Sequence, residues 1–117
     1  MSGMTGYLAG ISAEDIVAMQ YVRQGYGVKA QRWRGMGGEI DLIVDDGEMI
    51  VFVEVKKSSD FAQAAARLSE RQMRRIYTSA EGYLATSPKG LDGHARFDVA
   101  LVDGQGAVEI LENAFGQ

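Results

Sequence analysis

The chain contains no cysteine, one proline and one histidine among its 117 residues. Without cysteine, neither a disulfide framework nor a thiolate metal site can form. The single histidine, His94, excludes a zinc site built from several histidines. Any bound metal must therefore be held mainly by oxygen ligands, which favours Mg²⁺ or Mn²⁺.

A long hydrophobic run and a surplus of positive charge are also missing. The longest apolar run, Met49 to Val53, is far too short to span a bilayer. Met1 to Ser12 carries no Lys or Arg before its apolar residues, so no secretory signal is predicted. We therefore expect a cytoplasmic protein with no membrane partner. The formal net charge of −4 gives no global attraction to nucleic acid.

The composition, 46% hydrophobic and 24% charged, is typical of one globular domain over residues 1–117, with 1–11 expected to form a flexible tail. Ser12 is a candidate helix cap and Gly25 a helix end. Apolar periodicity predicts strands at 28–34, 39–44 and 49–56, a helix within 60–86, and strands at 96–102 and 107–111. This order predicts an α/β fold with a mixed central sheet flanked by helices.

Charged side chains stand at the ends of the apolar runs in 38–56. Alternate residues of a strand share a face, so Glu54 lies on the same face as Lys56, and Asp41 on the same face as Glu39. If both faces look the same way, Asp41 and Glu54 converge on one cation, with the carbonyl of Val55 as a further ligand. Lys56 would then orient or deprotonate a metal-bound water, or stabilise developing negative charge.

Two more acidic residues are candidates for this catalytic site. Glu14 lies one turn into the first predicted helix, and Glu39 precedes Asp41 by two positions. The structural alternative is that Glu54 and Lys56 form a simple salt bridge and that Asp41 only starts a hairpin. Glu-x-Lys alone is a weak motif. The ordered set of glycine turn, strand aspartate, hairpin, apolar strand and long helix favours the metal site.

Basic and aromatic residues surround this motif. The basic ones are Lys29, Arg32, Arg34, Lys56, Lys57, Arg67, Arg71, Arg74 and Arg75. They would form a phosphate-binding face if they share one side of the molecule, although for the arginines of 67–75 a solvated surface is the favoured interpretation. Trp33 and Tyr26 could stack on bases, but core packing is the commoner role for such residues.

The segments Gly-Glu-Ile-Asp-Leu-Ile (38–43) and Val-Phe-Val-Glu-Val-Lys (51–56) resemble the bacterial YraN-like family. That family is placed in the PD-(D/E)xK nuclease superfamily and is similar to archaeal Holliday-junction resolvases. The resemblance runs from about Gly10 to Phe115 and includes Arg-Phe-Asp-Val at 96–99. It implies an αβββαβ restriction-endonuclease-like core with an extra C-terminal strand. It also implies that Asp41, Glu54 and Lys56 occupy the motif positions and Glu14 that of the helical acid.

The resemblance implies a Mg²⁺- or Mn²⁺-dependent endonuclease that hydrolyses phosphodiester bonds of DNA, branched DNA included, and that acts as a homodimer. The alternatives are a non-catalytic nucleic-acid-binding or assembly module that retains the fold, and a protein-interaction domain. Two departures from the family pattern matter. Ser58 stands where members often carry a basic residue, and Gln72 where they tend to have lysine. Either change would weaken phosphate contacts, unless Gln72 approaches the site.

Overall fold

The computed structural model describes residues 12–57, 69–87 and 94–114. Its elements follow the predicted order: α2 (Ala13–Arg23), β1 (Gly27–Gly35), β2 (Gly38–Asp45), β3 (Met49–Lys57), α4 (Glu70–Thr86), β4 (His94–Val102) and β5 (Val108–Leu111). The expected tail at 1–11 and the start of the predicted helix within 60–86 lie outside the described residues.

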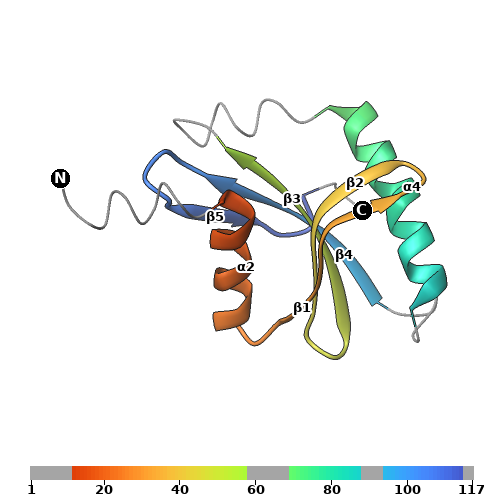
Figure 1. Cartoon of the computed structure of the whole chain (residues 1–117), viewed down its shortest axis with the longest axis horizontal. Coiled ribbons are helices and arrows are strands. Elements are labelled where there is room, and N and C mark those ends of the chain that lie inside the picture. The colour runs from red at the N-terminus through yellow and green to blue at the C-terminus, as the bar shows by residue number, and fades with distance from the viewer. Residues whose placement is uncertain (1–11, 58–68, 88–93, 115–117) are drawn as a thin grey trace.

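The five strands form one sheet in the order β1-β2-β3-β4-β5 (Figure 1). The pairs β1–β2, β2–β3 and β4–β5 are antiparallel, whereas β3 and β4 are parallel. Parallel neighbours need a crossover connection, and α4 lies in the connection between β3 and β4. The predicted mixed α/β fold is confirmed and is consistent with a restriction-endonuclease-like core.

A hydrophobic core lies on each face of the sheet, one under α2 and one under α4. The α2 core contains Ala13, Val17, Ala18, Tyr21, Leu42, Val44, Val51, Val53, Ala100 and Val102. The α4 core contains Ile40, Ile43, Ile50, Phe52, Ile76, Ala80, Val99 and Leu101. Successive residues of β3 enter alternate cores, which explains why this strand is a continuous apolar run.

Both helices begin at a serine that caps the first turn. Ser12 Oγ accepts a hydrogen bond from the Asp15 N–H, and Ser69 Oγ accepts one from the Gln72 N–H, each at 3.1 Å. After α2 the chain turns at Gly25, whose φ of 96° lies in the left-handed region that glycine adopts readily. Among the described residues, no helix is long and apolar enough to cross a membrane.

The tip of the β1–β2 hairpin is tied to α4. Ser79 Oγ accepts a hydrogen bond from the Gly37 N–H at 3.0 Å and donates one to the Gly38 carbonyl at 2.7 Å. A Cβ at Gly37 would overlap the carbonyl oxygen of Arg75. The hairpin can therefore lie directly on the helix backbone only because this position has no side chain.

A buried polar network explains the Arg-Phe-Asp-Val segment of β4. Asp98 is fully buried, and its carboxylate accepts hydrogen bonds from Tyr21 Oη at 2.7 Å and from the Asn113 N–H at 3.0 Å. Arg96 adds two more, at 2.9 and 3.0 Å. Burial and the charge of Asp98 raise the pKa of Tyr21, so the phenol stays a donor. These residues join α2 to β4 and have a structural role.

Candidate functional site

The candidate site lies where β2 separates from β3. Leu42 and Val53 form the last pair of the antiparallel β2–β3 register. One further step along both strands sets Asp41 opposite Glu54. There the ladder ends, and the Asp41 carboxylate accepts a hydrogen bond from the Val55 N–H at 2.8 Å. The N–H and C=O of one strand residue point the same way. The Val55 carbonyl is therefore directed toward the Asp41 side.

Glu54 is a buried carboxylate whose two oxygens have different surroundings. Its side chain reaches α4, where Gln72 Nε2 donates a hydrogen bond to Oε2 at 2.6 Å. Lys56 Nζ lies 3.7 Å from the same oxygen. The residue is only 9% exposed, and its Oε1 is buried with no hydrogen-bond partner among the described residues. A buried carboxylate oxygen without a donor is costly. A proton or a cation would satisfy it.

The two carboxyl groups perturb one another electrostatically. Burial, reinforced by the nearby charge of Asp41, raises the pKa of Glu54 to about 7, against the opposing effect of Lys56. Burial also raises the pKa of Asp41, against the opposing effect of the Val55 N–H. The charge of Asp41 thus acts directly on the carboxyl group of Glu54. The pair therefore carries more negative charge than its surroundings balance.

The other two predicted acids lie outside this pair. Glu14 pairs with Arg32, with 3.6 Å between Oε1 and Nη2, and Glu39 is exposed opposite Arg34. The charges of both acids still raise the pKa of Asp41. Within the described residues, no group of three or more Asp, Glu, His or Cys side chains is arranged to hold a metal. The predicted residues that the structure brings together are Asp41, Glu54, Val55 and Lys56.

Gln72 is the contribution of α4 to the site. In the sequence it stands out mainly as a departure from the family pattern, and its contact with Glu54 depends on how α4 packs. The only local signal is its place in the first turn after the Ser69 cap. Ser58, the other departure, lies outside the described residues.

Trp33 and Tyr26 are packing residues. The ring of Trp33 meets Tyr83 edge-on, with 5.5 Å between centroids, and that of Tyr26 meets Tyr21 edge-on at 5.4 Å. Both rings are partly buried beside a hydrophobic core. Of the two roles considered from sequence, the contacts support packing.

The β1–β2 pair is irregular at the level of Asp41. Arg32 lies opposite Asp41 and has a φ of 53°, a left-handed conformation that costs a non-glycine residue about 1–2 kcal/mol. The flanking pairs are Gln31–Leu42 and Trp33–Ile40. Strict alternation would send Ile40 and Ile43 to opposite faces, yet both enter the α4 core. The strand therefore changes face at Asp41, which places its carboxylate at the end of the β3 ladder.

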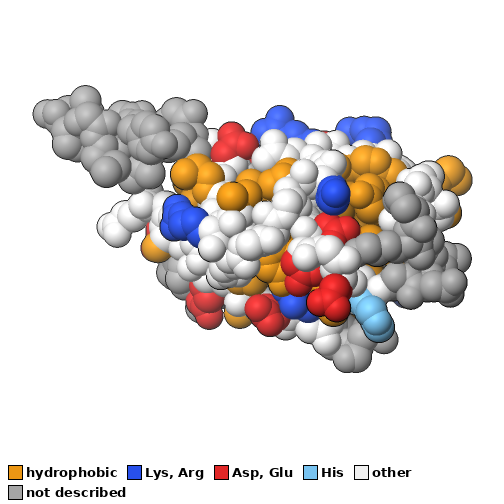
Figure 2. All heavy atoms as spheres, turned by 90° about the horizontal axis from the view of Figure 1, so that it is seen from below, with side chains coloured by type: hydrophobic (Ala, Val, Ile, Leu, Met, Phe, Trp, Pro, Cys, Tyr) orange, Lys and Arg blue, Asp and Glu red, His pale blue; other side chains and the backbone are white. Residues whose placement is uncertain are grey.

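Exposed basic side chains lie on two elements, α4 and β1. Three exposed arginines lie in the first two turns of α4, and three exposed basic residues lie on β1. They are Arg71, Arg74, Arg75, Lys29, Arg32 and Arg34. On the face drawn in Figure 2, Lys and Arg side chains are separated from one another, and several Asp and Glu side chains gather in the lower half of the view. Among the described residues drawn there, the basic side chains form no continuous patch.

The fold and site define a class: a mixed α/β protein with an acidic pair and a lysine at the ends of adjacent strands. Residues 13–102 match the uncharacterised protein family UPF0102. A UPF0102 protein of Cereibacter sphaeroides is 57% identical over 115 residues, covering 98% of each chain. One of Ruegeria pomeroyi is 54% identical, covering 97% of this chain and 93% of its own. The chain belongs to the UPF0102 family, and the expected YraN-like membership is confirmed.

Proposed function

We propose that this chain is a metal-dependent endonuclease of the PD-(D/E)xK type that hydrolyses phosphodiester bonds of DNA, branched DNA included. The observation that carries the proposal is Glu54 Oε1, a buried carboxylate oxygen that no donor in the described part of the chain reaches, in a carboxyl group that interacts with Asp41. Hard oxygen donors of this kind suit Mg²⁺ or Mn²⁺.

The residues of the site divide between holding a cation and handling substrate. Asp41, Glu54 and the Val55 carbonyl would hold the ion, which would act as a Lewis acid toward phosphate and water. Gln72 positions Glu54 by its 2.6 Å hydrogen bond to Oε2 and leaves Oε1 available. Lys56, 3.7 Å from the same carboxylate, supplies an ammonium to orient the attacking water or to stabilise charge on the phosphoryl oxygens.

The exposed arginines of α4 support a polyanionic substrate. Arg71 and Arg75 lie one helical turn apart, and Arg74 is beside them, all within three residues of Gln72. Each guanidinium can form bidentate hydrogen bonds to a phosphate. Because these charges lie on the helix that contacts Glu54, they can hold a DNA backbone near the acidic pair in spite of the negative net charge.

The test is cleavage of branched and linear duplex DNA in Mn²⁺ by the wild type and by Asp41→Asn, Glu54→Gln and Lys56→Met. The first two changes remove charge and keep an acceptor oxygen, so the Val55 and Gln72 hydrogen bonds can persist. Each variant should lose at least about a hundredfold in rate. The exposed Glu109→Gln is the matched control and should cleave normally. Undiminished cleavage by all three site variants would exclude this site.

A non-catalytic nucleic-acid-binding module is the second candidate. It is favoured by the lack of a third acidic ligand among the described residues and by the engagement of Glu54 Oε2 with both Gln72 and Lys56. This alternative predicts salt-sensitive DNA binding without turnover, which Asp41→Asn would leave intact. Single-turnover cleavage in Mn²⁺ distinguishes the two candidates.

A further inference from the structure

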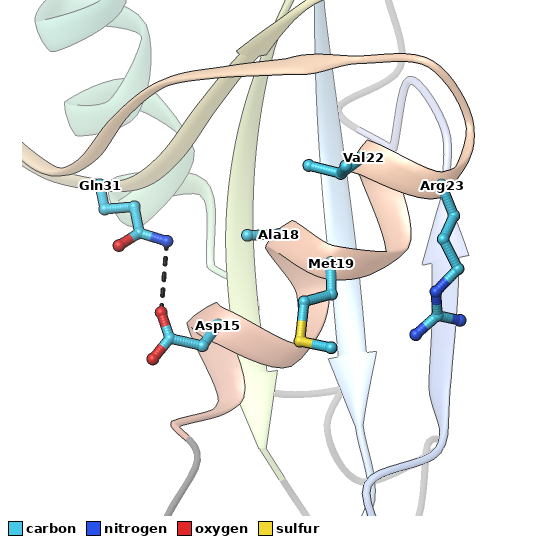
Figure 3. Close-up of a pocket in the computed structure, with 6 residues that line it drawn as sticks. All are labelled: Asp15, Ala18, Met19, Val22, Arg23 and Gln31. Carbon is cyan, nitrogen blue, oxygen red and sulfur yellow. Dashed lines mark hydrogen bonds between the residues drawn. The ribbon is translucent and has the colours of Figure 1, made fainter.

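The outer side of α2 is apolar and open to solvent. Met19 is 44% exposed and Val22 is 53% exposed, and Val28 of the adjoining strand β1 is 41% exposed. Beside them runs an open groove of about 550 Å³ between α2 and β1 (Figure 3). It is lined by Asp15, Ala18, Met19, Val22, Arg23 and Gln31. The opposite side of the same helix is fully used in the α2 core.

Charges of opposite sign bracket this surface. Asp15, Met19 and Arg23 are spaced four residues apart and therefore follow one stripe of the helix. In Figure 3 the Asp15 carboxylate and the Arg23 guanidinium lie at opposite ends of the groove, with Met19 between them. Gln31 donates a 3.3 Å hydrogen bond to one Asp15 oxygen. The acid thus stays at the groove's edge.

We propose that a second copy of this chain covers the groove, with its α2 antiparallel to the first α2 about a two-fold axis at Met19. Residues 15 and 23 are each four positions from Met19, so in this arrangement residue 15 of one helix faces residue 23 of the other. Each helix carries an acid, an apolar residue and a base in that order. Two antiparallel copies therefore place an acid against a base at both ends of the contact, as a two-fold interface requires. Asp15 of each copy pairs with Arg23 of the other, and the Met19 and Val22 side chains meet between the charged pairs.

The size of the proposed contact surface determines how strong a dimer we expect. The groove is lined by six residues, whereas each partner in a stable complex contributes about 20–30. We therefore expect a reversible dimer, populated as concentration rises. The proposed dimer contact involves α2 and does not disturb the hydrogen bond from Gln72 of α4 to Glu54. The inference consequently holds whether or not the proposed function does.

Charge reversal tests both the occupant and the orientation. Sedimentation equilibrium over a concentration series would compare the wild type with Asp15→Lys and Arg23→Glu, each alone and mixed in equal amounts. Each single variant brings like charges together twice per dimer and should weaken self-association at least about tenfold. The mixture restores opposite charges at both pairs and should dimerise as the wild type does. Glu81→Lys, an exposed reversal on α4, is the matched control.

Circular dichroism of each variant checks that it is folded. A wild type that stays monomeric throughout the series overturns the proposal and leaves the groove to a different occupant. Single variants that associate as strongly as the wild type overturn it as well. Folded single variants that stay monomeric when mixed contradict the antiparallel pairing, because that pairing alone places residue 15 against residue 23.

Discussion

At the scale of single residues, the central feature is Glu54, which is buried beside Asp41. Within 12–57, 69–87 and 94–114, partners contact only one of its two carboxylate oxygens. Glu54 receives a hydrogen bond from Gln72 and an ion pair from Lys56, both at Oε2. These contacts orient the carboxyl group but do not offset its burial, and its pKa remains raised to about 7. In the metal-free protein the site therefore favours a protonated Glu54 below neutral pH.

This raised pKa makes the free energy of unfolding depend on pH. The pKa of Glu54 rises from 4.5 in a free chain to about 7 in the folded one, so the folded protein holds an extra proton between these values. Stability from this group is complete below about pH 4.5 and is lost as pH rises through 7, a loss of about 3 kcal/mol. Glu54→Gln mimics the protonated form and should be the more stable protein at pH 8.

Urea unfolding from pH 4 to 8, with chelator present, measures the effect. The wild type and Glu54→Gln should have similar free energies of unfolding near pH 4 and diverge above pH 5. Glu109→Gln, an exposed change of the same kind, should follow the wild type. Parallel curves for wild type and Glu54→Gln would show that the carboxyl group titrates normally.

At the scale of elements, the contact between the β1–β2 hairpin and α4 holds the site together. The hairpin carries Asp41 and the helix carries Gln72, and they meet where Gly37 lies on the backbone at Arg75. Gly37→Ala places a methyl group against that backbone and should lower the free energy of unfolding by about 1–3 kcal/mol. Gly104→Ala is the control, since nothing lies within 4 Å of its added Cβ.

Thermal and urea unfolding of the two alanine variants would compare them. If Gly37→Ala is as stable as Gly104→Ala, the hairpin can move away from α4 at little cost. A loss of cleavage without a loss of stability would instead indicate that the hairpin has shifted and taken Asp41 with it.

The elements were predictable because their signals are local. The capping serine at 12, the glycine at 25 and the continuous apolar run that starts at 49 are physical causes that act within a few residues. The pairing of Asp41 with Glu54 was also accessible, since a short hairpin fixes its register. The left-handed Arg32 was not, because it results from packing between distant segments. The approach of Gln72 to the site was only one of two outcomes considered for that departure from the family pattern, because its contact depends on how α4 packs.

At the scale of the whole molecule, binding of a cation at the acidic pair would be linked to global stability. A ligand that binds only the folded chain adds about 2.7 kcal/mol when its concentration is a hundred times its dissociation constant. Mn²⁺ should therefore raise the melting temperature of the wild type near pH 8. Asp41→Asn and Glu54→Gln should lose most of this increase, and Glu109→Gln should keep it.

Calorimetry with and without Mn²⁺ measures this shift independently of any nuclease assay. An equal shift in all four proteins would mean that the ion binds elsewhere. A shift confined to proteins with an intact pair, together with no cleavage, would support the binding module as the function. The acidic pair belongs to β2 and β3 and its partner Gln72 to α4, so the whole fold has to be present in the assay.

The irregular backbone of β1 affects how readily the protein aggregates at high concentration. An edge strand invites another strand to add to it, and long regular edges promote fibrils. Here β1 carries a register shift between Val28 and Ala30 and a left-handed residue at Arg32. A strand from another molecule therefore finds only short stretches of β1 with correctly spaced hydrogen-bond donors and acceptors. The irregularities of β1 beside Asp41 should thus also reduce aggregation by strand addition.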